Sequence, residues 1–523
     1  MSYAVARFLL LGVLGLVTNA FASSNGEMQG AASTTITGRG GDSDYLAELL
    51  RHADSAKLAE RREWQALLHD RATLDGTGAL SDIDDSRFFL APAGRTDPHA
   101  ELAATLRAFF TADEVGGDPQ PAQCAFRARY KWLRHELTFD DHRLPPQLCA
   151  RFQQWLQQLD AESATLVFTS AYLNNPASLF GHTLLRLDRR NQTEQTRLLA
   201  YAVNYAANDS GSRGLMYAVN GMTGGFQGQF NIQPYYQLVR TYSDLESRDI
   251  WEYHLNLSKS QFQRLLEHIW ELRGIHFDYY FLKENCAWQL LTLLEVADPN
   301  LRLSDQFVLW TLPPDTLRLL VQQSDLVGAV SARPARGTSI RRRYEALNTT
   351  ERQLVRRLRN DPAVATEPRF VHLTPERQAL LLELALDERQ HRRAGSPRDK
   401  KVPPPDPIAH HLLIARNQRP AATPVEIEPY ATRPETGHAS RRIGLGFGQR
   451  DGTNFLELSA RASYHDLLEP DAGYTPDAQI ELLNIALRHY ADRGRLALER
   501  LTLLDITSLP PSNALNPRPA WRL

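Results

Sequence analysis

The stretch NNPASLFGHTLLRLD, residues 174–188, indicates how the central part of the chain folds. Its Asn-Asn-Pro start is typical of a turn. The following HTLLRLD has the apolar run of a strand and begins with His182, directly after Gly181. A turn that leads into a strand accounts for the Asn and Pro residues, but not for a histidine at the first strand position. We therefore take His182 as a candidate functional residue, and we expect Gly181 to leave room beside it for substrate or backbone.

The segments around this stretch predict an α+β domain over about residues 161–325. β-rich or alternating runs lie at 165–170 (TLVFTS), 197–204 (RLLAYAVN), 235–239 and 250–257 (IWEYHLNL). Ser258 is placed to cap an amphipathic helix over 261–273. The segment HFDYYFLKENCAWQLLTLLEVAD, residues 276–298, reads as an aromatic turn that runs into a helix starting near Glu284.

Cys286 falls near the start of that last helix. A helix N-terminus carries free N–H groups and positive partial charge, which favour a thiolate. A cysteine there, with His182 on a facing strand, is the arrangement of papain-like thiol enzymes. In such a pair the histidine takes the thiol proton, and backbone N–H groups near the helix start hold an oxyanion. We include Asn285 among the candidate substrate-binding residues.

A catalytic histidine also needs a group that fixes its tautomer and orientation. Asn204, on the next predicted strand, is our first candidate, because its side-chain oxygen can accept from one imidazole nitrogen while the other faces sulfur. Asn174, Asn175 and Asn208 are alternatives, and each of these asparagines is also explained as a turn or cap residue.

The N-terminal residues 1–22 have the charged, apolar and small-residue regions of a secretory signal peptide, with an uncleaved membrane anchor as the alternative. Residues 23–43, rich in Ser, Thr, Gly and Ala, read as a flexible linker. Export favours disulfides, and of the three cysteines Cys124 and Cys149 are the expected pair. Cys286 is then left over, as an intermolecular disulfide partner, a reactive thiol or a buried inert cysteine.

The segments on either side of the α+β domain differ from it in composition and hydrophobic pattern. Residues 44–160 predict a helical subdomain, residues 326–399 a basic helical segment and residues 400–436 a Pro-rich linker. Residues 437–523 alternate like three or four antiparallel strands, with a hairpin signal at Asp451-Gly452. The chain stops where Trp521 begins another strand-like run, so we expect a truncated piece of a longer β-domain.

Composition narrows the function classes. The 523 residues are 42 % hydrophobic and 23 % charged, with a formal net charge of −2, so no global field attracts nucleic acid. The basic run at 341–343 is expected to be a solvated helix face. The histidines of the α+β domain form no metal-binding motif, and we expect neither a metal nor a cofactor. The Gly-rich stretch at 221–230 reads as a mobile loop or lid, in which Phe226 lines a substrate channel or packs in the core.

Three blocks together, NNPASLFGHTLLRLD, LLAYAVNYAA and YYFLKENCAWQLLTLLEVAD, resemble the Lnb N-terminal periplasmic domain family over about residues 150–320. The resemblance implies a circularly permuted NlpC and papain-like fold in which the histidine precedes the cysteine. It places His182 and Cys286 in the positions of the catalytic pair. The family is one of Gram-negative cell envelopes, which implies a periplasmic or outer-membrane-associated protein.

The resemblance also implies thiol-based acyl chemistry on lipid or lipoprotein substrates, because the enzyme that gives the family its name moves an acyl chain through a thioester. That enzyme has several membrane-spanning helices, which this sequence lacks. We therefore expect a cysteine-dependent acyltransferase whose C-terminal β region associates with the outer membrane. The alternatives are a cell-envelope thiol amidase or peptidase with the same pair, and a non-catalytic envelope binding module.

Overall fold

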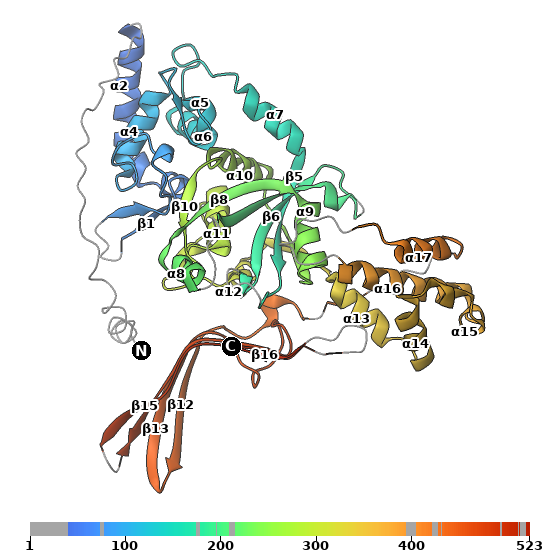
Figure 1. Ribbon diagram of the computed structural model, residues 1–523. Helices are drawn as coiled ribbons and strands as arrows, with labels where there is room; N and C mark the ends of the chain where they lie inside the picture. Colours follow the sequence, from blue (N-terminus) through green and yellow to red (C-terminus); the bar gives the residue numbers. More distant parts are fainter. Residues whose placement is uncertain are drawn as a thin grey trace. The chain divides into compact units, whose positions relative to one another are not determined.

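The computed structural model describes residues 40–73, 78–173, 178–194, 196–208, 215–393, 404–420, 427–429, 431–491, 494–510, 512 and 519–523. The predicted signal peptide, most of the linker and the Asn-Asn-Pro turn with Asn174 and Asn175 lie outside these residues. The mixed α+β class is confirmed. A helical N-terminal part, a central antiparallel sheet, a helical segment and a C-terminal antiparallel sheet follow one another along the chain (Figure 1).

The N-terminal part is built of short helices and two small hairpins. The helices are α2 (Gly40–Ser55), α3 (Arg62–Leu67), α4 (Pro98–Ala108), α5 (Ala122–Ala125), α6 (Arg127–Leu137) and α7 (Ala150–Leu159), and the hairpins pair β1 (Asp70–Ala72) with β2 (Ala79–Ser81) and β3 (Glu114–Val115) with β4 (Gln120–Pro121). Cys124 in α5 forms a disulfide with Cys149, the residue before α7. The bond therefore joins α5 to the start of α7.

The central sheet has seven antiparallel strands in the order β10-β8-β7-β6-β5-β9-β11. Its strands are β5 (Ala161–Thr169), β6 (His182–Arg189), β7 (Tyr201–Asn208), β8 (Phe226–Pro234), β9 (Ile250–Leu255), β10 (His276–Tyr279) and β11 (Val327–Arg333). Thr169 of β5 pairs with His182 at the start of β6. The sheet continues past residue 325 through β11, which pairs with β9.

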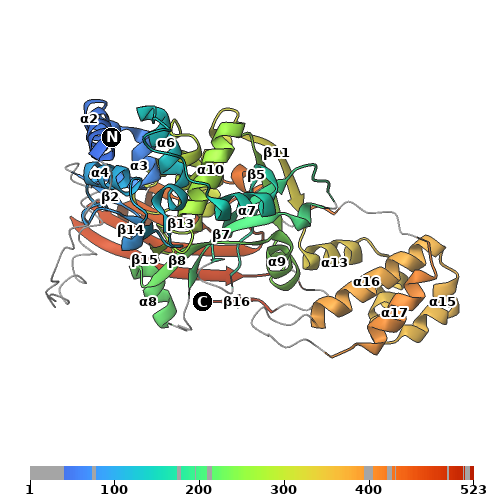
Figure 2. The same ribbon diagram turned by 90° about the horizontal axis from the view of Figure 1, so that it is seen from above.

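Both faces of this sheet are buried, as expected for strands that read as continuous apolar runs. On one face Leu185 and Val203 belong to the main core, together with α10 (Lys259–Glu271) and α11 (Cys286–Ala297). On the other face Leu184 and Ala202 pack against α9 (Tyr235–Val239). Ser258 makes the predicted capping box at the start of α10. Figure 2 shows α9 and α10 with the strands of this sheet from above.

Two expectations for this domain are wrong. Residues 235–239 form helix α9 rather than a strand, since a five-residue apolar run fits either period. The stretch 221–230 is not a loop: it runs from helix α8 (Leu215–Thr223) into strand β8. Its glycines admit aromatic rings, because a Cβ on Gly221 would lie 2.2 Å from the Phe281 ring, and one on Gly228 would lie 2.1 Å from the Tyr205 hydroxyl.

The helical segment has its own small core, in which Leu354, Phe370, Leu382 and Leu412 are fully or almost fully buried. It contains α13 (Arg336–Glu345), α14 (Thr349–Leu358), α15 (Pro368–Val371), α16 (Pro375–Arg393) and α17 (Pro407–Asn417). Helix α17 lies within the span expected to be a Pro-rich linker, and Figure 2 shows it beside α16.

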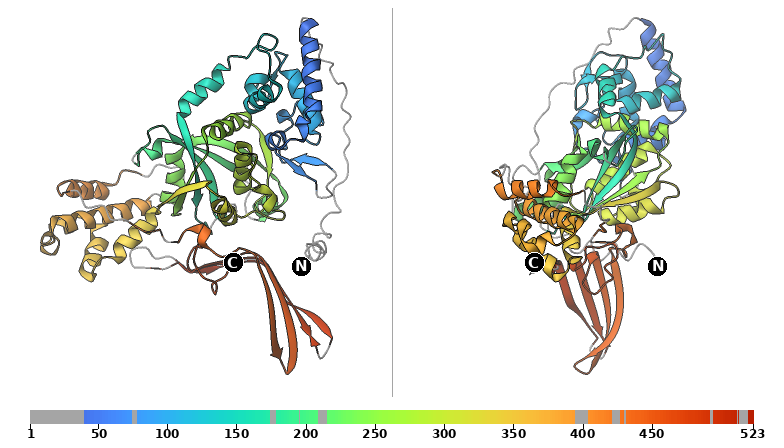
Figure 3. Two further views of the ribbon diagram at one scale, coloured as in Figure 1. Left: turned by 180° about the vertical axis from the view of Figure 1, so that it is seen from behind. Right: turned by 90° about the vertical axis from the view of Figure 1, so that its right-hand side faces the viewer.

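The C-terminal sheet has five antiparallel strands in sequence order. They are β12 (Arg442–Arg450), β13 (Thr453–His465), β14 (Ala478–Tyr490), β15 (Arg495–Ser508) and the short β16 (Trp521–Arg522), and Figure 3 shows the four long ones side by side. Asp451 and Gly452 form the predicted two-residue turn between β12 and β13, with φ values of 50° and 74°. Two positive φ values in succession fit a type I′ turn, which strongly favours glycine.

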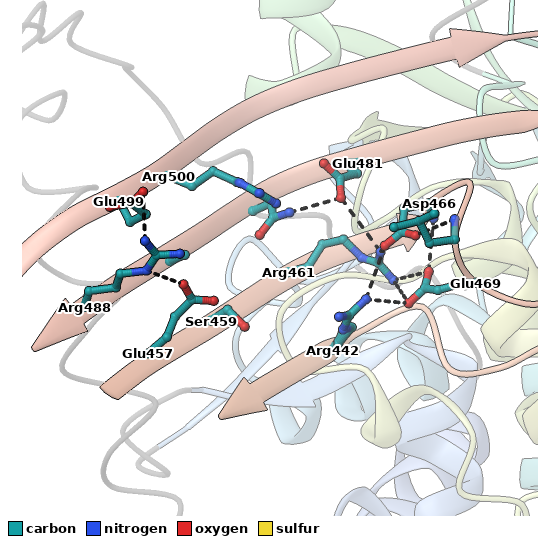
Figure 4. A pocket seen from close by; sticks show the side chains of 13 residues that line it. Arg442, Glu457, Ser459, Arg461, Asp466, Glu469, Glu481, Arg488, Glu499 and Arg500 are labelled. Atoms are coloured by element: carbon teal, nitrogen blue, oxygen red, sulfur yellow. Dashed lines mark hydrogen bonds and ion pairs between the residues drawn. The ribbon is translucent and has the colours of Figure 1, made fainter. Parts of the chain in front are cut away.

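Alternation along these strands separates an apolar face from a charged one. Leu445, Leu458, Leu487 and Leu498 are directly paired across four strands, and three of the four are more than 40 % exposed. On the opposite face arginines alternate with carboxylates around a hollow of about 410 Å³ (Figure 4). Unlike the central sheet, this sheet therefore leaves an apolar face uncovered. Among the helices of the described residues, none is both long and apolar enough to cross a bilayer.

Candidate active site

Cys286 is the first residue of helix α11. Asn285 caps this helix: its side-chain oxygen accepts from the backbone N–H groups of Ala287 (3.0 Å) and Trp288 (3.3 Å). The Asn285 side-chain amide donates to the carbonyls of Phe281 (3.0 Å) and Thr311 (2.7 Å). Asn285 thus fixes the start of α11 to the preceding turn, and it holds the thiol at the positive end of a helix.

His182 reaches the same point from strand β6. The backbone turns into this strand at Gly181, whose φ of +98° favours glycine. A Cβ at Gly181 would lie 2.4 Å from the Phe168 ring, so the space beside His182 is filled by Phe168. Gly181 is therefore required by its backbone conformation and by its contact with Phe168, and it does not leave room for substrate.

Asn204 on β7 binds the His182 ring. His182 Nε2 lies 2.7 Å from Asn204 Oδ1. An amide oxygen accepts hydrogen bonds, so Nε2 carries the hydrogen and Nδ1 is left with a lone pair. The side chains of His182 and Cys286 are also hydrogen-bonded to each other, which leaves Nδ1 as the ring nitrogen for the thiol. The structure therefore brings Cys286, His182 and Asn204 together in one hydrogen-bonded series.

The electrostatics of the pair favour its charged form. Burial raises the pKa of the Cys286 thiol, but the charge and hydrogen bond of His182 and a hydrogen bond from the Thr183 backbone outweigh burial and lower it to about 7. Burial likewise opposes the imidazolium, yet attraction to Cys286 and the bonds from Cys286 and Asn204 raise the pKa of His182 overall. A thiolate and an imidazolium are thus both favoured near neutral pH.

Two tyrosines border the pair. The Tyr242 ring packs on His182 with its centroid 5.6 Å away, and it belongs to the π-helical turn Arg240–Leu245, a geometry frequent at functional sites. The Tyr279 hydroxyl accepts from the backbone N–H of Cys286. Burial, followed by the charge of Cys286, raises the pKa of Tyr279 well above its usual value, so this phenol stays protonated. Neither tyrosine was singled out from the sequence, because each lies in an aromatic-rich run that reads as core.

The other sequence-derived residues lie nearby but have structural partners. Phe226 is 2 % exposed and packs with Phe281 and Tyr217, at centroid distances of 5.9 and 5.2 Å. Asn208 lies at the exposed end of β7. One thiol and one imidazole are fewer than the three protein ligands of a catalytic zinc, so the site suits covalent chemistry better than metal binding.

The three central residues are buried. Cys286 is 2 % exposed, His182 6 % and Asn204 7 %. Leu179 and Phe180, just before His182, pack with Tyr464 and Ile506 of the C-terminal sheet, as does Leu282, just before Asn285. The segments that lead into both halves of the pair therefore contact the C-terminal sheet, and side chains must move before a substrate reaches the thiol.

Comparison with protein families supplies the identification. Residues 151–323 match the Lnb N-terminal periplasmic domain. The central part of the chain is a member of this family. All three residues of the buried series fall within the matched span.

The other matches are to domains of unknown function: DUF7843 at residues 56–136, DUF7842 at 330–427 and DUF7840 at 431–523. Their spans correspond to the helical N-terminal part, the helical segment and the C-terminal sheet. Comparison with curated proteins and with solved structures finds no match for the chain.

Proposed function

We propose that the central domain is a cysteine-dependent acyltransferase of the cell envelope that works through a thioester on Cys286. One observation carries the proposal: a buried thiol at a helix start shares hydrogen bonds with a histidine whose other nitrogen is held by an asparagine. Membership in a periplasmic domain family supports the envelope location. The permuted papain-like order, histidine before cysteine, supports the same chemistry.

The first half-reaction follows from the proton positions. The Cys286 thiol gives its proton to His182 Nδ1, and the sulfur attacks the carbonyl carbon of an ester donor. In this proposal the backbone N–H of Cys286 and the Tyr279 hydroxyl, which bind each other in the free protein, turn to the resulting oxyanion. The C–O bond then breaks, His182 returns the proton to the leaving alcohol, and an acyl thioester remains.

The second half-reaction reverses these roles. An amine or hydroxyl acceptor attacks the thioester carbonyl and gives its proton to His182, and the C–S bond breaks to restore the thiol. Throughout, Asn204 keeps the imidazole in one orientation. With water as the acceptor the same steps describe a hydrolase, and with an amide donor and water an amidase, so donor and acceptor together decide the class.

A product assay separates these classes. The full chain is incubated separately with a diacylated lipopeptide, a phospholipid or a muropeptide, with and without a peptide amine as acceptor, and products are resolved by mass spectrometry. The proposal expects an N-acylated peptide in place of free fatty acid. Free acid alone, whatever the acceptor, indicates a hydrolase. Cleaved muropeptides without acyl transfer indicate an amidase, and no product from any of these donors contradicts the proposal.

We propose further that the apolar face of the C-terminal sheet contacts membrane lipid, which would bring the site to an acylated substrate. Phe447 and Leu445 of this face are 92 % and 79 % exposed. An uncovered apolar surface of this kind marks an interaction site. Burying one Phe contributes roughly 1.5–3 kcal/mol, so Phe447→Ser should weaken binding to phospholipid vesicles about tenfold. The matched control is Arg500→Ser on the charged face. Equal binding by Phe447→Ser and the wild type in a flotation assay would remove this part of the proposal.

A further inference from the structure

Two histidines and a glutamate converge at the base of the C-terminal sheet. His465 is the last residue of β13, and Glu469 follows it in the loop to β14. His438 comes from the segment between the short turn η8 (Pro434–Thr436) and β12. His465 is 2 % exposed, whereas the side chains of His438 and Glu469 are 25 % and 14 % exposed. The group is therefore walled on one side and open to solvent on another.

The spacing of the three facing atoms fits one small cation. His438 Nε2 lies 3.0 Å from His465 Nδ1 and 3.5 Å from Glu469 Oε2, and His465 Nδ1 lies 3.8 Å from the same oxygen. Zinc bonds of about 2.0–2.1 Å in a tetrahedron separate neighbouring ligand atoms by about 3.3–3.4 Å. The triangle formed by these three atoms brackets that value.

The outer nitrogens of both rings face oxygen atoms, as they do in metal-binding histidines. His438 Nδ1 lies 2.8 Å from the carbonyl oxygen of Ala439, to which it can only donate. His465 Nε2 makes no hydrogen bond within the described part of the chain, but the Asp471 carboxylate lies 3.5 Å from it and favours a hydrogen on this nitrogen. Such outer partners fix the tautomer in metal sites. They place the hydrogens outside and leave a lone pair on each nitrogen that faces inward.

In this arrangement three hydrogen-bond acceptors face one another: the inward nitrogens of His438 and His465 and an oxygen of Glu469. Glu469 Oε2 accepts from the backbone N–H of Asp466 at 3.0 Å and from Arg461 at 2.7 Å, as a carboxylate does. Two lone pairs 3.0 Å apart beside a carboxylate repel unless a proton or a cation lies between them. The ligand types, imidazole nitrogen and carboxylate oxygen, are those that zinc accepts.

We propose that His438, His465 and Glu469 bind one Zn²⁺ ion, with a fourth position open to water. Arg318 of α12 (Pro313–Gln322) donates to the His438 carbonyl at 2.7 Å, as does the Tyr474 hydroxyl at 2.7 Å. The ion therefore fastens the segment that contacts the central domain to the end of strand β13, which gives it a structural role at this junction.

The glutamate is the weakest of the three ligands. Arg461 donates to both of its oxygens, at 2.8 and 2.7 Å, and Arg442 lies 3.3 Å from Oε1 (Figure 4). These guanidinium groups orient the carboxylate, but they also compete with a cation for it. We therefore expect the two imidazoles to supply most of the affinity.

Zinc binding by the full chain tests the proposal. Protein stripped with a chelator is dialysed against Zn²⁺ and the bound metal is measured by mass spectrometry, with Co²⁺ as a spectroscopic probe of tetrahedral geometry. One ion per chain is expected, with near-complete loss in His438→Ala and a weaker loss in Glu469→Gln. His438 is partly exposed, so its variant is expected to fold, and circular dichroism checks this.

The matched control is His489→Ala, an exposed histidine on β14 of the same sheet. It should bind zinc as the wild type does. Absence of stoichiometric metal from folded wild-type protein overturns the proposal and leaves a shared proton as the occupant of the triangle. Undiminished binding in folded His438→Ala overturns it as well. Because Cys286 is not among the ligands, thiol acylation can fail or succeed independently of either result.

Discussion

The central and C-terminal sheets each place a histidine at the end of a strand, with different surroundings. His182 begins β6 and meets a thiol and an amide, while His465 ends β13 and meets a second imidazole and a carboxylate. The thiol neighbour raises the pKa of the first histidine, and burial with an imidazole neighbour lowers that of the second. The same side chain is thereby suited to proton transfer in one sheet and to metal ligation in the other.

The sheets also differ in how they are covered. Helices bury the central sheet on both faces, whereas the C-terminal sheet leaves an apolar face exposed. A buried sheet holds catalytic groups rigidly, and an open apolar sheet is suited to contact with another surface. The difference supports a division of roles between chemistry in the centre and attachment at the C-terminal end.

The largest expected effect is the loss of chemistry in Cys286→Ala. Removing the nucleophile should lower acyl transfer by about 10⁴-fold or more, because binding alone cannot form the thioester. Initial rates with a lipopeptide donor measure this. His254→Ala, a partly exposed histidine on β9 of the same sheet, is the matched control and should keep the wild-type rate. Equal rates in Cys286→Ala and wild type would remove the chemical role of the central site.

The second effect tests whether the apolar faces of the two sheets differ in burial. Leu185 is 1 % exposed on β6, and Leu445 is 79 % exposed on β12. Leu185→Ala should destabilise the central domain by about 2–5 kcal/mol. Leu445→Ala should change stability by no more than about 0.5 kcal/mol. Urea unfolding followed by tryptophan fluorescence measures both, and similar losses in the two variants would mean that something covers the apolar face.

The third effect concerns the amide that holds His182. Asn204→Ala should lower acyl transfer by about 10–100-fold, because the imidazole loses its orientation. Asn208→Ala, at the exposed end of the same strand, should keep the wild-type rate of acyl transfer. If Asn208→Ala and Asn204→Ala lowered the rate equally, the loss would be a general effect of altering β7.

The smallest effect is a shift in the pH profile. Activity should fall in acid as the Cys286 thiolate, with its pKa of about 7, is protonated. It should fall in alkali as the imidazolium of His182 loses its proton, above the usual histidine pKa. The Asn204 hydrogen bond raises the pKa of His182, so Asn204→Ala should move the alkaline limb to lower pH. Rates of the variant across pH 5–10 measure this shift. An alkaline limb at the wild-type position would show that Asn204 does not raise the pKa of His182.

Much of the fold follows from local sequence signals. Asp451-Gly452 predicts its hairpin, Ser258 its helix cap and the block around Cys286 its helix, because each signal depends on backbone chemistry within a few residues. Short apolar runs fit more than one type of element. Residues 235–239 fit a strand as well as the helix they form, and the glycines at 221–230 resemble a loop although they make room for Phe281 and Tyr205.

The candidate site was predictable in part for the same reason. His182 and Cys286 each stand at the start of a recognisable element, but their pairing follows mainly from the resemblance to the Lnb N-terminal periplasmic domain family. Asn204 was chosen among several asparagines because it lies on the next predicted strand. Tyr279 was missed because its contact with the Cys286 backbone depends on the turn between β10 and α11. The His438 and His465 pair was missed because 27 residues and a hairpin separate them, and only the sheet register brings them together.

Trapping the acyl-enzyme tests the central claim most directly. The full chain is mixed with a diacylated lipopeptide without acceptor, quenched in acid, and analysed by intact mass and peptide mapping. We expect one acyl chain on the peptide that contains Cys286, released by neutral hydroxylamine as a thioester and absent from Cys286→Ala. An unmodified Cys286 in protein that turns over the same donor would contradict the account.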